Sequence, residues 1–145
     1  MTSFTTLVLL AFFFANPAPT SLDQVKAEPN ADKRARLAVD YSMVAEKAAE
    51  AEYAKGDLEA TAVQLKNMSE SVELVKASLI AGGRTPGRNT GQYKYAEQKS
   101  QELLIRLRDL EQRMDDEERQ TITPHRAKVQ EIHDEWFEGI MERKK

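Results

Sequence analysis

Apolar residues recur at spacings of three and four along most of this chain, which is the pattern of amphipathic helices. Beyond residue 30, glycine and proline are confined to Gly56, the stretch 82–91, Pro124 and Gly139. The sequence lacks the sustained alternation of apolar and polar residues that marks a half-buried strand. The pattern therefore predicts four helices between these breaks, at residues 31–55, 58–81, 93–114 and 116–143.

Each predicted helix carries one apolar stripe, as expected when every helix contributes one face to a shared core. In chain order the stripes are Leu37, Tyr41, Val44, Ala48 and Ala51; Leu58, Leu65, Met68, Val72, Val75 and Leu79; Tyr93, Ala96, Ser100, Leu103, Leu107, Leu110 and Met114; and Ile122, Val129, Ile132, Trp136 and Ile140. We expect an all-α fold, an up-down-up-down four-helix bundle after an N-terminal signal segment. The alternatives are a three-helix bundle and a helical hairpin that dimerises.

The residues at the helix ends support these boundaries. Asn30 and Asp57 are suitable N-caps, and Gly56 stands directly after the first helix, where a left-handed residue is common. So short a link makes the first two helices an antiparallel hairpin. Pro124 lacks a backbone donor, so we expect the last helix to be kinked or broken near this residue, with Thr123 as the N-cap of its main part.

The first 22 residues carry no charged side chain, and residues 7–15 form an unbroken apolar run of nine. A helix that crosses a bilayer needs about 20 apolar residues, so the shorter run is typical of a signal peptide. We expect a signal peptide at residues 1–20, cleaved after Thr20 or Ser21, a short linker at 21–30 and a single helical domain at 31–145. An uncleaved N-terminal anchor is the alternative.

Composition narrows the class of protein further. The chain has 145 residues, a net charge of −3 and no cysteine. A small exported domain without disulfides is typical of bacteria, so we expect a periplasmic or extracellular location. The missing cysteines exclude thiol catalysis and cysteine-ligated metal centres. Net acidity without a continuous basic face argues against nucleic acid as a partner.

The stretch from residue 82 to 99 is the most basic part of the chain. It combines glycines with four cationic side chains and a single acid, Glu97; the cations are Arg84, Arg88, Lys94 and Lys99. Arginines on a flexible loop next to the start of a helix favour an anionic partner, so we predict a binding site at these four residues. The alternative is a solvated hinge between two helical hairpins.

The chain has two histidines, and neither belongs to the Glu-x-x-His motif of di-metal helical bundles. A site for a single metal or a small ligand built from His133 and Glu131, with Tyr93 nearby, is the weaker alternative. A histidine at the edge of the core is the simpler interpretation.

The sequence shows no local grouping of nucleophile, base and acid, so we expect no enzyme activity and no cofactor. The predicted function is that of a non-catalytic binding or interaction module of the cell envelope, with a protein or an anionic envelope component as partner. Membrane contact is expected only if the signal segment is retained. The alternatives are a bundle that binds a small ligand or metal and a helical protein anchored by its N-terminus. The pattern leaves the oligomeric state open.

Overall fold

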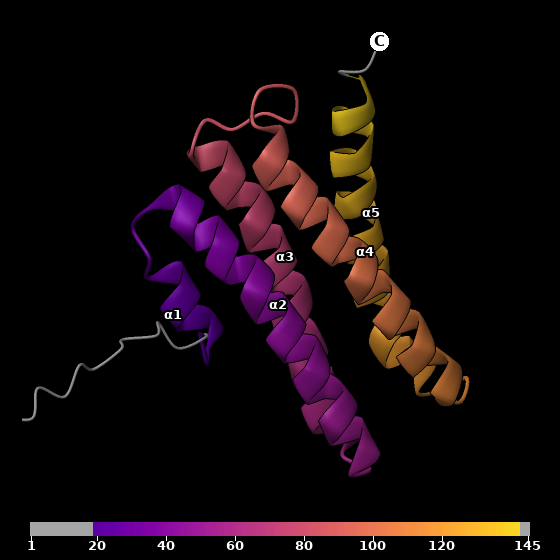
Figure 1. Ribbon diagram of the computed structural model, residues 1–145. Coiled ribbons are helices and arrows are strands. Elements are labelled where there is room, and N and C mark those ends of the chain that lie inside the picture. Colours follow the sequence, from indigo (N-terminus) through magenta and orange to yellow (C-terminus); the bar gives the residue numbers. More distant parts are fainter. Residues whose placement is uncertain (1–18, 143–145) are drawn as a thin grey trace, which may run out of the picture.

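The computed structural model describes residues 19–142, which form five helices and no strand. A short helix is followed by four long ones, each antiparallel to the next along the chain (Figure 1). Their bounds are α1 Leu22–Lys26, α2 Ala31–Ala54, α3 Leu58–Ala81, α4 Thr90–Arg113 and α5 Arg119–Glu142. The prediction of an all-helical bundle with four long helices is confirmed.

The helix bounds agree with the sequence pattern except near the loops. The bounds of α3 coincide with the prediction, α4 begins three residues early at Thr90, and α5 begins three residues late at Arg119. The stretch 21–30, expected as a linker, contains α1. Its side chains Leu22 and Val25 are buried against the bundle. The predicted signal segment lies almost wholly outside the described residues.

The turn between α2 and α3 explains why these helices form a tight hairpin. Gly56 adopts a φ of +78°, and its N–H donates to Tyr53 O at 2.9 Å. Asp57 N–H donates to Glu52 O at 3.1 Å, so the two bonds close a Schellman motif. The Asp57 carboxylate then accepts from Ala60 N at 2.9 Å and caps α3. The predicted roles of Gly56 and Asp57 are therefore confirmed.

The four long helices pair as two hairpins, α2 with α3 and α4 with α5, and α3 contacts α5 while α2 contacts α4. The first hairpin is close because α2 turns alanines toward α3. Ala38, Ala45 and Ala49 are at most 1% exposed. The Ser71 hydroxyl of α3 donates to Ala38 O across this interface at 2.7 Å. The small alanine side chains thus let the backbones of α2 and α3 approach so closely that the short side chain of Ser71 reaches from one to the other.

The predicted core stripes of α4 and α5 are buried throughout, and that of α3 is buried except at Leu58. The predicted stripe of α2 is partly wrong. Val44 is 41% exposed and Ala51 is exposed, whereas Ser42 and Glu46 are buried. Helix α2 is rotated relative to the most hydrophobic choice of face, because the face rich in alanine allows the closer approach to α3.

Of the two outcomes expected at Pro124, a kink or a break, the break is not found, since α5 runs through this proline as one helix. The preceding turn is held by a capping box: Glu118 N–H donates to Asp115 Oδ1 at 2.8 Å, and Asp115 N–H donates to Glu118 Oε2 at 3.0 Å. Thr123 is therefore not an N-cap, and its hydroxyl donates to Arg119 O at 2.8 Å. Pro124 leaves α5 with one backbone hydrogen-bond donor fewer, but the helix continues on both sides of this residue.

The loop between the hairpins, residues 82–89, is fixed at several points. Gly83 has a φ of +70°, and Arg84 N–H donates to Leu79 O at 2.9 Å in a second Schellman motif. The Tyr93 hydroxyl donates to Arg84 O at 3.0 Å. Pro86 lies so close to α5 that a Cβ added at Gly139 would stand 2.7 Å from Pro86 Cγ. The loop is therefore seated on the last turns of α5.

This contact predicts the effect of a methyl group at residue 139. Alanine favours a helix over glycine by about 1 kcal/mol, but in G139A the methyl collides with the rigid ring of Pro86. We expect G139A to destabilise the native chain and to stabilise a P86G background, with a coupling energy of about 0.5–2 kcal/mol. Urea unfolding of the four proteins measures this cycle. Equal effects of G139A in both backgrounds would contradict the contact.

Candidate functional site

A cavity of about 480 Å³ lies between α2, α3 and the start of α4, directly beside the 82–89 loop. Its size falls within the range of about 300–1,000 Å³ that is usual for small-ligand sites. Its lining residues are Asp32, Ala35, Arg36, Val39, Val75, Leu79, Arg88, Asn89, Thr90, Gly91, Gln92, Tyr95 and Ala96. The wall supplied by α3 is aliphatic, and the other side carries polar and charged groups. The cavity is therefore amphipathic.

The charged groups of this lining are not equivalent. Asp32 accepts from Arg84 Nε at 2.9 Å and from Arg84 Nη2, and these hydrogen bonds lower the pKa of the Asp32 carboxyl. The Arg36 guanidinium lies over the ring of Tyr95, 3.9 Å from its centroid, in a cation–π contact. Arg88 is exposed and makes no ion pair with any described residue. The charge left available at the cavity is positive.

The structure separates the four predicted binding residues into two pairs. Arg84 is bound to Asp32, and Lys99 Nζ pairs with Glu102 Oε2 at 3.1 Å within α4. Arg88 and Lys94 are exposed and make no ion pair within residues 19–142. Arg88 lines the cavity, whereas Lys94 does not. The predicted basic site thus contains two cations with a structural role and two that are free to meet a ligand.

The first turn of α4 adds to the positive character of the cavity. Asn89 precedes the helix, but its side chain makes no cap hydrogen bond and accepts from Thr85 N at 3.3 Å instead. N–H groups in the first turn of a helix have no acceptor within that helix. Because Gly91 and Gln92 line the cavity, the positive end of the α4 dipole lies at its edge.

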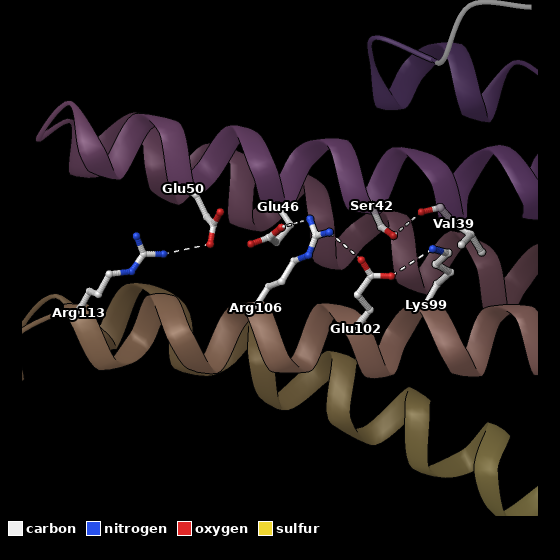
Figure 2. A network of polar contacts seen from close by, with 8 residues as sticks. All are labelled: Val39, Ser42, Glu46, Glu50, Lys99, Glu102, Arg106 and Arg113. Carbon is white, nitrogen blue, oxygen red and sulfur yellow. Dashed lines mark hydrogen bonds and ion pairs between the residues drawn. The ribbon is translucent and has the colours of Figure 1, made fainter.

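A second polar feature follows the seam between α2 and α4, which Figure 2 shows from close by. Glu46 of α2 is fully buried and points at Arg106 of α4, with 3.3 Å between Glu46 Oε2 and Arg106 Nη1. Arg106 Nη2 donates to Glu102 Oε1 at 2.6 Å, and Glu102 also pairs with Lys99. Further along, Arg113 pairs with Glu50 at 3.0 Å. Charged pairs therefore connect the two hairpins along this seam.

The buried carboxylate of Glu46 has too few hydrogen-bond partners. Its second carboxylate oxygen, Oε1, has no hydrogen-bond partner. Burial, reinforced by the nearby charge of Glu50, raises the pKa of Glu46 to about 7, although Arg106 opposes this shift. The group consequently changes its charge near neutral pH while it is enclosed between the hairpins.

The predicted alternative site around His133 is dispersed. His133 is buried, its Nδ1 lies 2.9 Å from Ser100 Oγ, and its Nε2 lies 3.8 Å from Glu97 Oε1. Glu131 is exposed and pairs with Lys128 at 3.5 Å. Tyr93 anchors the loop through Arg84 O. Across residues 19–142, no group of three or more histidines and acids is arranged to hold a metal ion.

Ser100, His133 and Glu97 have the composition of a catalytic triad, and because His133 lies 33 residues from Ser100 the trio gives no local sequence signal. Their environment does not suit hydrolysis. Ser100 is 2% exposed, and its hydroxyl donates to Glu97 O of its own helix at 2.8 Å. A nucleophile must be reachable by its substrate, so this trio is better described as a satisfied polar contact between α4 and α5.

Arg36 and Glu46 were not predicted from the sequence as members of polar sites. Arg36 and Tyr95 come together from separate helices, and the Tyr95 hydroxyl also donates to Asp40 Oδ1 at 2.8 Å. Glu46 occupies a helix that is rich in other charged residues, so its burial had no distinct sequence signal.

Comparison with known proteins found no matching family model, no matching curated protein and no matching solved structure.

The buried Glu46 predicts a dependence of stability on pH. Between its ordinary pKa of 4.5 and its folded pKa of about 7, the folded state holds a proton that the unfolded state has lost. The stabilisation that this proton gives the folded state is therefore fully present below pH 4.5, and it is lost as the pH rises through 7. Over this window the loss is on the order of 3 kcal/mol. We expect E46Q to remove this pH slope, measured by urea unfolding across the window.

The difference in pH dependence between wild type and E46Q isolates the contribution of Glu46 to the free energy of unfolding. Burial lowers the pKa of His125, which gives a slope of the opposite sign below about 6.5 in both proteins. An E46Q protein with the same pH profile as wild type would contradict the assignment.

Proposed function

We propose that this protein is a non-catalytic binding module of the cell envelope. Its binding surface is the end of the bundle formed by the 82–89 loop and the first turns of α4. The observation that supports this most is that two exposed cations beside the amphipathic cavity, Arg88 and Lys94, make no ion pair within residues 19–142. The expected partner is an acidic protein or another anionic component of the envelope.

The rigidity of this surface supports the proposal. Arg84 is used to hold the loop on Asp32 of α2, and Pro86 seats the same loop on Gly139 of α5. A loop fixed to two helices presents its side chains in a defined geometry, which lowers the entropic cost of binding. This favours a binding role over that of a solvated hinge.

The location belongs to the same proposal. We infer export to a bacterial periplasm or exterior from the short apolar run at residues 7–15 and the absence of cysteine from the chain. In the part of the chain that the structure describes, no helix is long and apolar enough to cross a membrane. Retention of the N-terminal segment as an anchor is the alternative.

A double substitution tests the binding surface. We expect R88S combined with K94S to abolish salt-sensitive capture of a partner from an envelope extract, because both free cations are removed while the Arg84–Asp32 pair stays intact. The matched control is K47S with R108S, which removes two exposed cations from other parts of the bundle. Equal capture by the two double variants would refute the proposed surface. Circular dichroism verifies that both remain helical.

The N-cap of α1 predicts where the signal segment is removed. The Ser21 hydroxyl caps α1 by accepting from Gln24 N at 3.2 Å, and Leu22 and Val25 are buried. Of the two predicted cleavage positions, cleavage after Thr20 leaves this cap in place. We expect the intact mass of the exported protein to correspond to a chain that begins at Ser21. A full-length mass would favour the anchored alternative.

A further inference from the structure

The residues on both sides of the bond between Thr20 and Ser21 belong to the fold. Pro19 is buried, and the Thr20 N–H and hydroxyl both donate to Gln24 Oε1, at 2.9 and 3.0 Å. On the other side of the bond, the Ser21 hydroxyl accepts from Gln24 N at 3.2 Å. Gln24 thus holds both neighbours of the bond, which is thereby fixed at the start of α1.

Helix α1 is itself anchored to the bundle, where it contacts α2 and α3 (Figure 1). Val25 is fully buried, and Leu22 is 8% exposed. Beyond the helix, Arg34 of α2 donates from Nη1 to Glu28 O at 2.8 Å and from Nε to Ser78 Oγ of α3 at 2.9 Å. This N-terminal segment is therefore held by apolar burial within α1 and by hydrogen bonds at both ends.

A peptidase binds its substrate as an extended segment, so a bond within folded structure is cut only when that segment opens. We propose that α1 protects the Thr20–Ser21 bond, so that a signal peptidase removes the signal segment only before α1 has packed on the bundle. Leu22 is the second residue after the bond, so extending the chain across the bond draws Leu22 out of the core and unwinds α1. This inference rests on the proposed export of the protein and specifies the stage at which processing occurs.

The folded segment also accommodates the product of the cleavage. Hydrolysis adds one water molecule across the bond, which leaves a carboxylate on Thr20 and an ammonium group on Ser21. The hydrogen bonds from Thr20 to Gln24 are then lost, whereas the cap between Ser21 Oγ and Gln24 N is retained. The new ammonium group borders a groove lined by two acids and one lysine, namely Asp23, Glu70 and Lys26. The net negative charge of this groove offsets the unfavourable effect of a cation at the start of a helix.

Folding and processing of the chain therefore compete. The contacts of α1 are with α2 and α3, the next two helices along the chain, and local contacts of this kind form quickly. A chain that reaches the peptidase unfolded loses the signal segment and then packs α1. A chain that folds first keeps the segment, because its processing site is already enclosed.

Cleavage of the purified full-length protein by a purified bacterial signal peptidase, in a detergent that keeps the enzyme active, tests this order. V25D places a charge at a fully buried position of α1, four residues beyond Ser21. The matched control is V63D, which makes the same change at a position of α3 that is 54% exposed. L107D introduces a charge at a fully buried core position and supplies an unfolded full-length substrate. Circular dichroism verifies that the first two variants remain helical and that L107D does not.

We expect V25D and L107D to be cut at least about tenfold faster than wild type, and V63D to be cut as slowly as wild type. V25S, which shortens the same side chain without adding a charge, is the milder companion variant. We expect its cleavage to be about threefold faster or more. The intact mass of the product, a chain that begins at Ser21, identifies the bond that is cut.

Contrary results separate this inference from the proposed export. Cleavage of folded wild type as fast as that of V25D and V25S would overturn the protection by α1 and leave the proposed export intact. Fast cleavage of V63D, or slow cleavage of both Val25 variants beside fast cleavage of L107D, would assign the protection to something other than α1. If even unfolded L107D is not cut, the segment is not a processed signal, and the proposed export fails together with this inference.

Discussion

The small side chains along α2 determine how the bundle is assembled. Ala38, Ala45 and Ala49 are almost completely buried, and they let α3 approach until Ser71 reaches a carbonyl of α2. The first hairpin is therefore the close-packed unit to which the second hairpin attaches. The contact between α2 and α4 also uses other groups.

Those groups are the charged side chains along the seam between α2 and α4. Glu46 is carried inward by the rotation that places the alanines against α3, and Arg106 meets it from α4. Arg106 remains partly exposed, and the cost of burying the Glu46 carboxylate offsets much of what the pair contributes, so the pair orients the hairpins more than it binds them. At the other end of the seam, the small residues Ala35 and Ala96 are among those that line the cavity.

Much of the fold could be predicted from periodicity, because α3, α4 and α5 each carry most of their large apolar residues on a single face. The buried face of α2 could not be predicted in the same way. Alanine is only weakly apolar, so the more apolar Val44 was assigned to the core, although it is exposed. The 82–99 segment was recognisable by its composition. Its division into structural and free cations was not, because the partner of Arg84 lies 52 residues away in the chain.

The contact between Pro86 and Gly139 also determines which part of the protein is completed last during folding. The loop that borders the cavity is seated on the last turns of α5, close to the C-terminal end of the described residues. A chain that emerges from its N-terminus, from a ribosome or through a translocation channel, completes the α2–α3 hairpin first. It can seat this loop only after nearly all of α5 has followed. The end of the bundle that carries the cavity is thus finished last, so a truncated chain would retain helices but lack the support of that end.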